Sequence, residues 1–152
     1  MEFASPYIEM FIQVIVALLL GSLVGLERLL AGKQAGMRTF GLVAVGACLF
    51  VMIGEIVAGQ YQGVMNFDPL RVAASIVTGI GFIGAGLIIF QHELKGLTTA
   101  AALWVASAIG VAVGFELYLL ATFVTFLTLF VCVGLWFLER RLERLFRHKN
   151  DA

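Results

Sequence analysis

Five long apolar stretches, separated by short polar connections, divide this chain. They cover roughly residues 8–30, 39–58, 70–90, 97–114 and 117–138. A helix that crosses a bilayer needs roughly 20 mostly apolar residues, which these stretches supply or approach. Pro69 stands at the start of the third stretch, where its missing N–H costs nothing, and no proline interrupts any stretch. The pattern predicts an all-α, polytopic membrane protein with about five transmembrane helices.

The composition agrees with a membrane environment. Of the 152 residues, 61% are hydrophobic and 13% are charged, and the mean hydropathy is +1.02. Soluble domains carry about 25% charged residues, so a soluble fold of this size could not hide so much apolar surface. The acidic N-terminal segment MEFASPYIEM lacks the basic residues of a cleavable signal peptide, so we expect the first stretch to remain as a helix. The expected partner is the lipid bilayer, and the zero net charge gives no field that would recruit nucleic acid.

The residues that carry most chemistry are scattered. Cys48 and Cys132 each lie midway along an apolar stretch, which is typical of small buried side chains rather than of a disulfide. His92 and His148 are far apart and have no partner at metal-ligand spacing. No nucleophile–base pair or phosphate-binding loop appears either. The sequence therefore predicts no metal, no cofactor and no enzymatic activity.

Basic residues predict the orientation in the membrane. Nine of the ten Lys and Arg residues fall in the connections after the first and third stretches or in the C-terminal tail. Such residues remain on the cytoplasmic side, so the N-terminus should lie outside and the C-terminus inside, with Arg71 as the exception. Residues 1–138 would form the five-helix transmembrane domain, and residues 139–152 a basic amphipathic tail. That tail either rests on anionic lipid or only solubilises and orients the chain.

The segment TGIGFIGAG, residues 78–86, has the letter pattern of a dinucleotide-binding turn. That pattern has chemical meaning only where a strand turns into a helix of a soluble βαβ unit, and here it lies inside an apolar stretch. At 100° per residue, one face of this stretch is small and carries Arg71, Ala74, Thr78, Gly81 and Ala85. Branched side chains occupy the opposite side. We therefore predict that the small face packs on a neighbouring helix and that the branched face meets lipid.

Small residues recur at helical spacing in the first, second and fourth stretches. The predicted helix-packing glycines are Gly21, Gly25, Gly79, Gly81, Gly84, Gly86, Gly110 and Gly114. The alternative is that they line a tight pore or a substrate niche. The fifth stretch is bulky and aromatic, so we expect it at the periphery, facing lipid or another subunit.

Ionisable residues at membrane depth are candidate functional groups because their burial is expensive. On the predicted outer side, Asp68 precedes Pro69 and has the character of a helix N-cap. Arg71, three residues later, can pair with Asp68 along the helix, and Glu55 could be a second partner. A role of Asp68 and Arg71 in gating or ligand binding is the alternative interpretation.

A second polar cluster is predicted on the inner side. The helices that begin near residues 39 and 97 would present free N–H groups there, together with Lys33 and Lys95. An anion-binding concavity is one interpretation, and interfacial anchors with threonine caps are the other. Glu27 would be the internal counter-charge, and Arg38 is expected to be the most sensitive position. The members of this cluster are Glu27, Arg28, Arg38, Thr39, Thr98 and Thr99.

Three ordered motifs closely resemble the membrane domain of the MgtC/SapB family. They are GLER…GMRTFGLVAVGA, DPLRVAASIVTGIGFIGAG and GLTTAAALWVASAIGVAVG, and the likeness covers about residues 15–115. The matching positions are Glu27, Arg28, Arg38, Thr39, Asp68, Arg71, the glycines of the third stretch, Thr98, Thr99 and Trp104. Ser75 departs from the glutamine that such proteins often have. Several members also continue into a cytoplasmic domain, whereas this sequence ends at Ala152.

The resemblance implies a multi-pass protein of the bacterial cytoplasmic (inner) membrane. Some members are linked to growth under magnesium limitation and to virulence, and they are thought to regulate other membrane machinery. We therefore expect a non-enzymatic protein that contacts another membrane protein or forms a homo-oligomer. The rival hypothesis is a small oligomeric ion transporter or channel, with charged residues at both mouths. A third is recognition of an anionic lipid or metabolite at the inner mouth.

Overall fold

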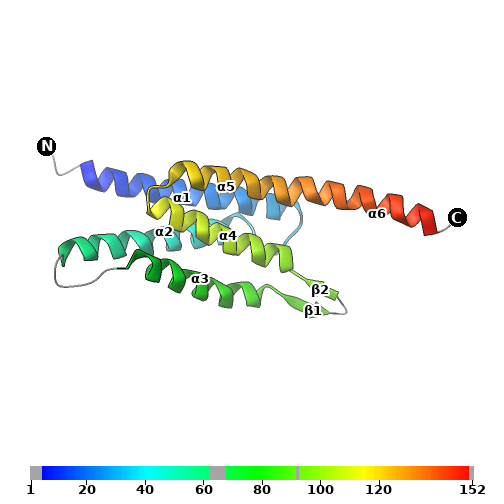
Figure 1. Cartoon of the computed structure of the whole chain (residues 1–152), viewed down its shortest axis with the longest axis horizontal. Coiled ribbons are helices and arrows are strands. Elements are labelled where there is room, and N and C mark those ends of the chain that lie inside the picture. Colours follow the sequence, from blue (N-terminus) through cyan, green and yellow to red (C-terminus); the bar gives the residue numbers. More distant parts are fainter. Residues whose placement is uncertain (1–4, 62–67, 92, 151–152) are drawn as a thin grey trace.

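The computed structural model describes residues 5–61, 68–91 and 93–150. Its helices are α1 (Ser5–Leu30), α2 (Met37–Gln60), α3 (Pro69–Gly86), α4 (Leu97–Gly114), α5 (Tyr118–Phe130) and α6 (Trp136–Asn150). A π-helical turn, η2 (Val131–Leu135), joins α5 to α6, and β1 (Ile89–Gln91) pairs with β2 (Glu93–Lys95) (Figure 1). Five helical segments are long and apolar enough to cross a membrane, the fifth being Tyr118–Leu142. The predicted all-α fold with five spans is confirmed.

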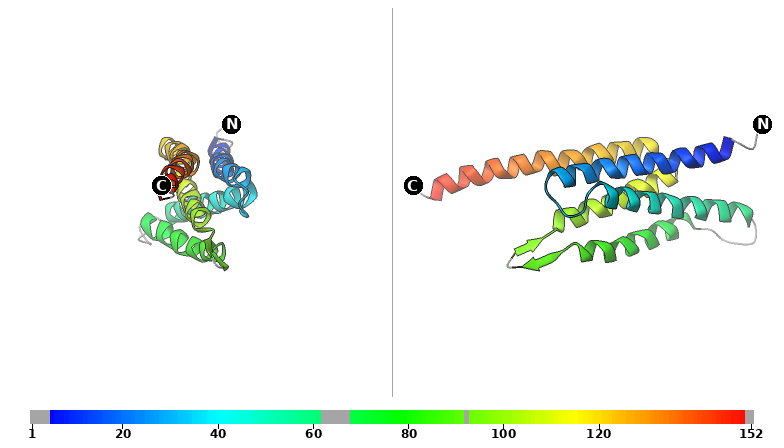
Figure 2. Two further views of the ribbon diagram at one scale, coloured as in Figure 1. Left: turned by 90° about the vertical axis from the view of Figure 1, so that its right-hand side faces the viewer. Right: turned by 180° about the vertical axis from the view of Figure 1, so that it is seen from behind.

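The helices form an elongated bundle whose two ends differ. The chain starts at one end, where α2 and α4 finish and α3 and α5 start (Figure 1). The opposite end holds the α1–α2 connection and the hairpin, and α6 projects beyond it (Figures 1 and 2). We call these two ends the N-side and the C-side. Arg71, at the start of α3, lies on the N-side, away from the basic residues of the α1–α2 connection and of α6.

The third span is shorter than predicted. It was expected to reach residue 90, but α3 ends at Gly86, and the next residues form the hairpin in which Ile89 pairs with Lys95. Gly96 then closes the hairpin at φ +94°, a conformation that favours glycine. A Cβ atom at this position would also collide with the carbonyl oxygen of Leu87. The short apolar run LIIF that follows Gly86 is compatible with either a helix or a strand, so periodicity alone could not place the end of the helix.

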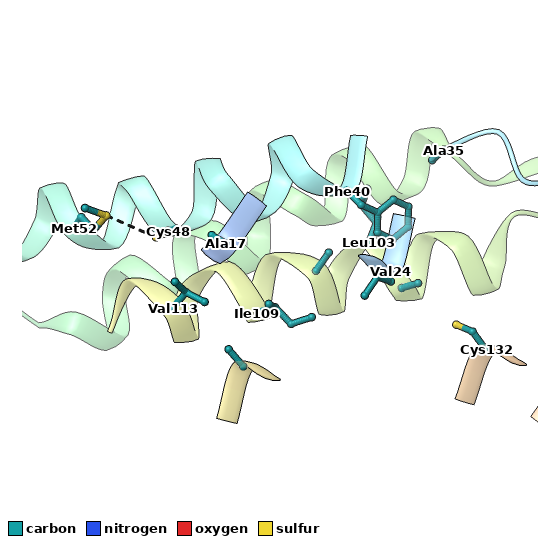
Figure 3. Packing of buried hydrophobic residues seen from close by; sticks show 13 residues of the cluster. Ala17, Val24, Ala35, Phe40, Cys48, Met52, Leu103, Ile109, Val113 and Cys132 are labelled. Atoms are coloured by element: carbon teal, nitrogen blue, oxygen red, sulfur yellow. Dashed lines mark hydrogen bonds between the residues drawn. The ribbon is translucent and has the colours of Figure 1, made fainter. Parts of the chain in front are cut away.

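The core lies where α4 packs on α1 and α2. α4 is the most enclosed span, and Leu103, Ile109 and Val113 on it are fully buried or nearly so (Figure 3). The prediction that Cys48 and Cys132 are buried and unlinked is confirmed, and the Cys48 thiol donates to the Met52 sulfur at 3.6 Å. The cluster is apolar throughout, and its buried members are Ala17, Val24, Ala35, Phe40, Cys48, Met52, Ala102, Leu103, Ala106, Ile109, Val113, Ala121 and Cys132.

Ala44 on α2 is the point at which α1 and α4 both approach most closely. A Cβ atom on Gly21 would lie 2.6 Å from the Cβ of Ala44, and one on Gly110 would collide with the Ala44 carbonyl oxygen. A Cβ atom built on Gly25 would lie 2.7 Å from the Cα of Met37, and one built on Gly114 would lie 2.7 Å from the Cβ of Val51. These four glycines allow backbones to touch, which is how helices in lipid gain packing energy.

The third span packs differently from the prediction. Within the described part of the chain, nothing lies within 4 Å of a Cβ built on Gly79, Gly81 or Gly86, and only Gly84 has a neighbour, Ala100 at 3.8 Å. The small face is exposed, whereas Ile80 on the opposite side is buried. The predicted assignment of the two faces is therefore wrong inside this chain. A buried branched side chain such as Ile80 fills more space between helices than a glycine face can.

The glycine contacts generate a direct test. Replacing Gly110 by Ala should lower the stability by about 1–3 kcal/mol, because the added methyl group meets a backbone carbonyl that cannot rotate away. Thermal unfolding of the purified protein in detergent, followed by circular dichroism, measures the change. Gly81→Ala is the matched control, because its new Cβ faces open space. Equal melting temperatures for the two variants would show that the close approach at Ala44 does not hold the bundle together.

Candidate functional site

The C-side contains a charged pair that the fold encloses. Arg28, in the last turn of α1, is only 3% exposed, and its guanidinium donates two hydrogen bonds to the Glu27 carboxylate. One of them, from Nη2 to Oε1, is 2.6 Å long, and the other joins Nε to Oε2. This bidentate geometry is the strongest form of arginine–carboxylate pairing. Glu27 thus pairs with Arg28, its neighbour in α1, and the two charges neutralise each other within that helix.

The π-helical turn lies beside this pair. Cys132 in η2 is buried, and its thiol is next to the Glu27 carboxylate and the Arg28 guanidinium. A π-helical turn inserts an extra residue into a helix and is found frequently at functional sites. The fifth span thus approaches the end of α1 at the turn that holds Cys132, a contact that no apolar pattern in the sequence indicated.

The other members of the predicted inner cluster are more open. Arg38 and Thr98 are exposed, Thr39 is half-buried, and Thr99 is buried. Neither threonine of α4 is a cap, because the N-cap position belongs to Gly96, and α2 likewise starts after Gly36. The structure therefore separates the cluster into a closed pair, Glu27–Arg28, and an exposed group. It does not place Arg28 in an open anion-binding concavity.

On the N-side, the predicted cap forms and the predicted ion pair does not. The Asp68 carboxylate accepts a hydrogen bond from the Leu70 backbone N–H at 3.0 Å. Among the described residues, no carboxylate lies within 4.0 Å of the Arg71 guanidinium, so neither Asp68 nor Glu55 pairs with it. An N-cap carboxylate is held at the start of the helix axis, which leaves Arg71 to extend along the side of α3. Arg71 lies on the wall of a groove between α2 and α3.

Sequence reasoning missed a polar contact that joins α1 to the α4–α5 connection. Gln13 is only 5% exposed, and its side-chain N–H donates to Glu116 at 3.4 Å. Glu116 has φ +61°, the only described non-glycine residue with a positive φ. A lone glutamine inside the apolar run FIQVIV was the available signal. This contact links the N-side half of α1 to the α4–α5 connection.

The basic tail extends the fifth span. α6 continues the direction of α5 through η2 instead of turning across the end of the bundle (Figures 1 and 2). The Arg140 guanidinium carbon lies 4.0 Å from the ring centre of Trp136. Arginine above an aromatic ring near a span end is typical of the membrane–water boundary. The expected boundary at residue 138 falls inside α6, and the tail's role at the lipid surface stays a prediction.

Comparisons with known proteins place the chain among bacterial membrane proteins. A model described as the MgtC family matches residues 14–141. Protein SrpB of Synechococcus elongatus is 36% identical over 150 residues, which cover 93% of this chain and 80% of SrpB. YhiD of Escherichia coli (strain K12) is 39% identical over 126 residues, 81% of this chain and 59% of YhiD. Protein MgtC of Brucella abortus is 45% identical over 99 residues, 64% of this chain and 39% of that protein. No solved structure matches.

The enclosed ion pair predicts a strong asymmetry between single and double substitutions. Glu27→Gln leaves the Arg28 charge buried without its partner, which should cost about 3–5 kcal/mol of stability. The double variant Glu27→Leu/Arg28→Met removes both charges at similar volume and should recover most of that loss. Denaturant unfolding in detergent measures each free energy. If the stability lost in the double variant equalled the sum of the losses of its two single substitutions, the two side chains would not form a coupled, buried pair.

Proposed function

Because this chain belongs to the MgtC family, we propose that it supports bacterial growth when magnesium is scarce. It is a multi-pass protein of the bacterial inner membrane. Two relatives carry names that point in the same direction: one is Protein MgtC, and the name of YhiD proposes magnesium transport. The chain spans only 39% of MgtC and 59% of YhiD, so their whole activity is not transferred.

The mechanism that we propose is non-enzymatic contact with another membrane protein or with a second copy of this chain. The observation that carries it is the small face of α3. Ala74, Thr78, Gly81 and Ala85 follow one another along this face, and all four are exposed. Such a face allows the backbone of a neighbouring helix to approach closely. Since the opposite, branched side of α3 lines the groove toward α2 and Gly84 lies near Ala100 of α4, the small face supports a contact outside this chain.

Exposed polar and charged groups would orient that contact. Arg38 and Thr98 are accessible on the C-side, and Asp68 caps α3 on the N-side. We propose that Arg38 meets the partner where the bundle ends. Arg28 is assigned a structural role, because its guanidinium is already held by Glu27.

An oligomeric ion transporter or channel is the second candidate, favoured by the name of YhiD. Within the described bundle, the interior between α1, α2 and α4 is filled by apolar side chains. An ion could not leave water for such an interior without a large cost in free energy. A pathway would therefore have to form between copies of the chain, with Asp68 and Arg38 at its mouths.

A growth test addresses the contact hypothesis. In a bacterial strain that depends on this protein for growth at low magnesium, Gly81→Leu should abolish that growth, because the new side chain keeps a partner helix away. Phe123→Leu on the exposed surface of α5 is the control and should grow normally. Protein levels and melting temperatures are compared so that a folding defect is recognised. Growth of Gly81→Leu at the control rate would argue against a contact through this face.

A flux test separates the two candidates. We expect purified protein in liposomes to give no magnesium, potassium or proton flux above that of protein-free liposomes. Saturable flux would favour the transporter, and in that case Asp68→Asn should reduce it. Asparagine caps a helix as well as aspartate does, so this substitution removes the charge and keeps α3 intact. Arg38→Ala tests the opposite mouth in the same assay.

A further inference from the structure

A groove lies between α2 and α3. Its volume is about 800 Å³, and its walls are apolar except for Arg71 and Ser75. At 100° per residue, the groove wall of α3 meets the small face only at Arg71; the wall consists of Arg71, Val72, Ser75, Ile76, Gly79, Ile80 and Ile83. α3 thus has a small exposed face, a branched side that lines the groove, and Gly84 near Ala100 of α4.

The groove has the length of one leaflet. On α3 it runs from Arg71 to Ile83, which at the helical rise per residue corresponds to about 18 Å. The hydrocarbon of one leaflet is about 15 Å thick, half of a bilayer core of about 30 Å. Arg71 lies in the first turn after Pro69, at the N-side end of the span. The groove thus starts at headgroup level and follows the chain direction of a lipid.

Arg71 presents its charge at the end of this groove. Its guanidinium forms no ion pair with any residue that the structure describes. The neighbouring polar groups are engaged locally: the Ser75 hydroxyl donates to the Arg71 carbonyl oxygen at 2.9 Å, and the Asp68 carboxylate caps α3. An exposed guanidinium at headgroup level lies beside lipid phosphates, and a phosphate matches its planar set of donors.

We propose that this groove binds an anionic membrane phospholipid, with its phosphate on Arg71 and one acyl chain along α2 and α3. A flexible acyl chain is thin enough to enter the groove. Gly46 on α2 and Gly79 on α3 widen the groove, since neither has a neighbour within 4 Å of a built Cβ. The proposal does not depend on the proposed function.

The test is photo-crosslinking in nanodiscs. The full chain is reconstituted in phosphatidylcholine with a trace of phosphatidylglycerol that carries a diazirine on one acyl chain, or with the matching phosphatidylcholine probe. Labelled peptides are mapped by mass spectrometry. We expect groove residues of α2 and α3 to be labelled about fivefold more by the phosphatidylglycerol probe, the ratio that one arginine near an anionic lipid provides.

Variants distinguish the headgroup contact from the groove itself. Arg71→Ala should bring the ratio of the two probes to about one, and Arg71→Lys should keep most of the preference. Gly79→Leu fills the groove and should reduce labelling by both probes, whereas Gly81→Leu on the other side of α3 should not. Melting temperatures show whether each variant is folded.

Two results would overturn the proposal. One is equal groove labelling by both probes in the unmodified chain, or a preference that survives in Arg71→Ala. The other is a dimer, detected by light scattering, that Gly79→Leu dissociates while lipid labelling stays unchanged. That second result would assign the groove to a second copy of the chain.

Discussion

The close contact of α1 and α4 with the two sides of Ala44 is the constraint on which the rest of the bundle depends. Lipid surrounds apolar side chains as well as another helix does, so helices in a bilayer associate mainly through tight packing. Gly21 and Gly110 remove the atoms that would keep the backbones apart at Ala44, and Gly25 and Gly114 extend the contact along both interfaces. The three helices therefore form a single packed unit.

The position of α3 follows from that unit. Since α1, α2 and α4 use their small residues on one another, α3 joins at the periphery, where Gly84 lies near Ala100 of α4 and Ile80 is buried. Its remaining two sides stay open, one with small residues and one on a groove that ends at Arg71. The least enclosed helix thus carries the surfaces that are available for a partner protein and for lipid.

The two ends of the bundle use charge in different ways. On the C-side, Glu27 and Arg28 neutralise each other where the π-helical turn covers them. On the N-side, Asp68 stabilises the start of α3, and Arg71 is left without a carboxylate among the described residues. A closed pair contributes to the architecture, whereas an unpaired charge at headgroup level attracts an anion from outside the chain.

The sequence by itself determined the class, the five spans and the cap at Asp68, because these depend on residue periodicity and on contacts between neighbours in the chain. It also indicated the glycines of the first and fourth spans as packing positions. Only the tertiary structure decided which face of α3 packs, because that choice depends on the space left by the other helices. The same holds for Arg71, which was expected to pair with Asp68, and for Cys132, which meets Glu27 and Arg28 across more than 100 positions. Contacts between residues so far apart depend on how helices are arranged, which the pattern along a single chain does not specify.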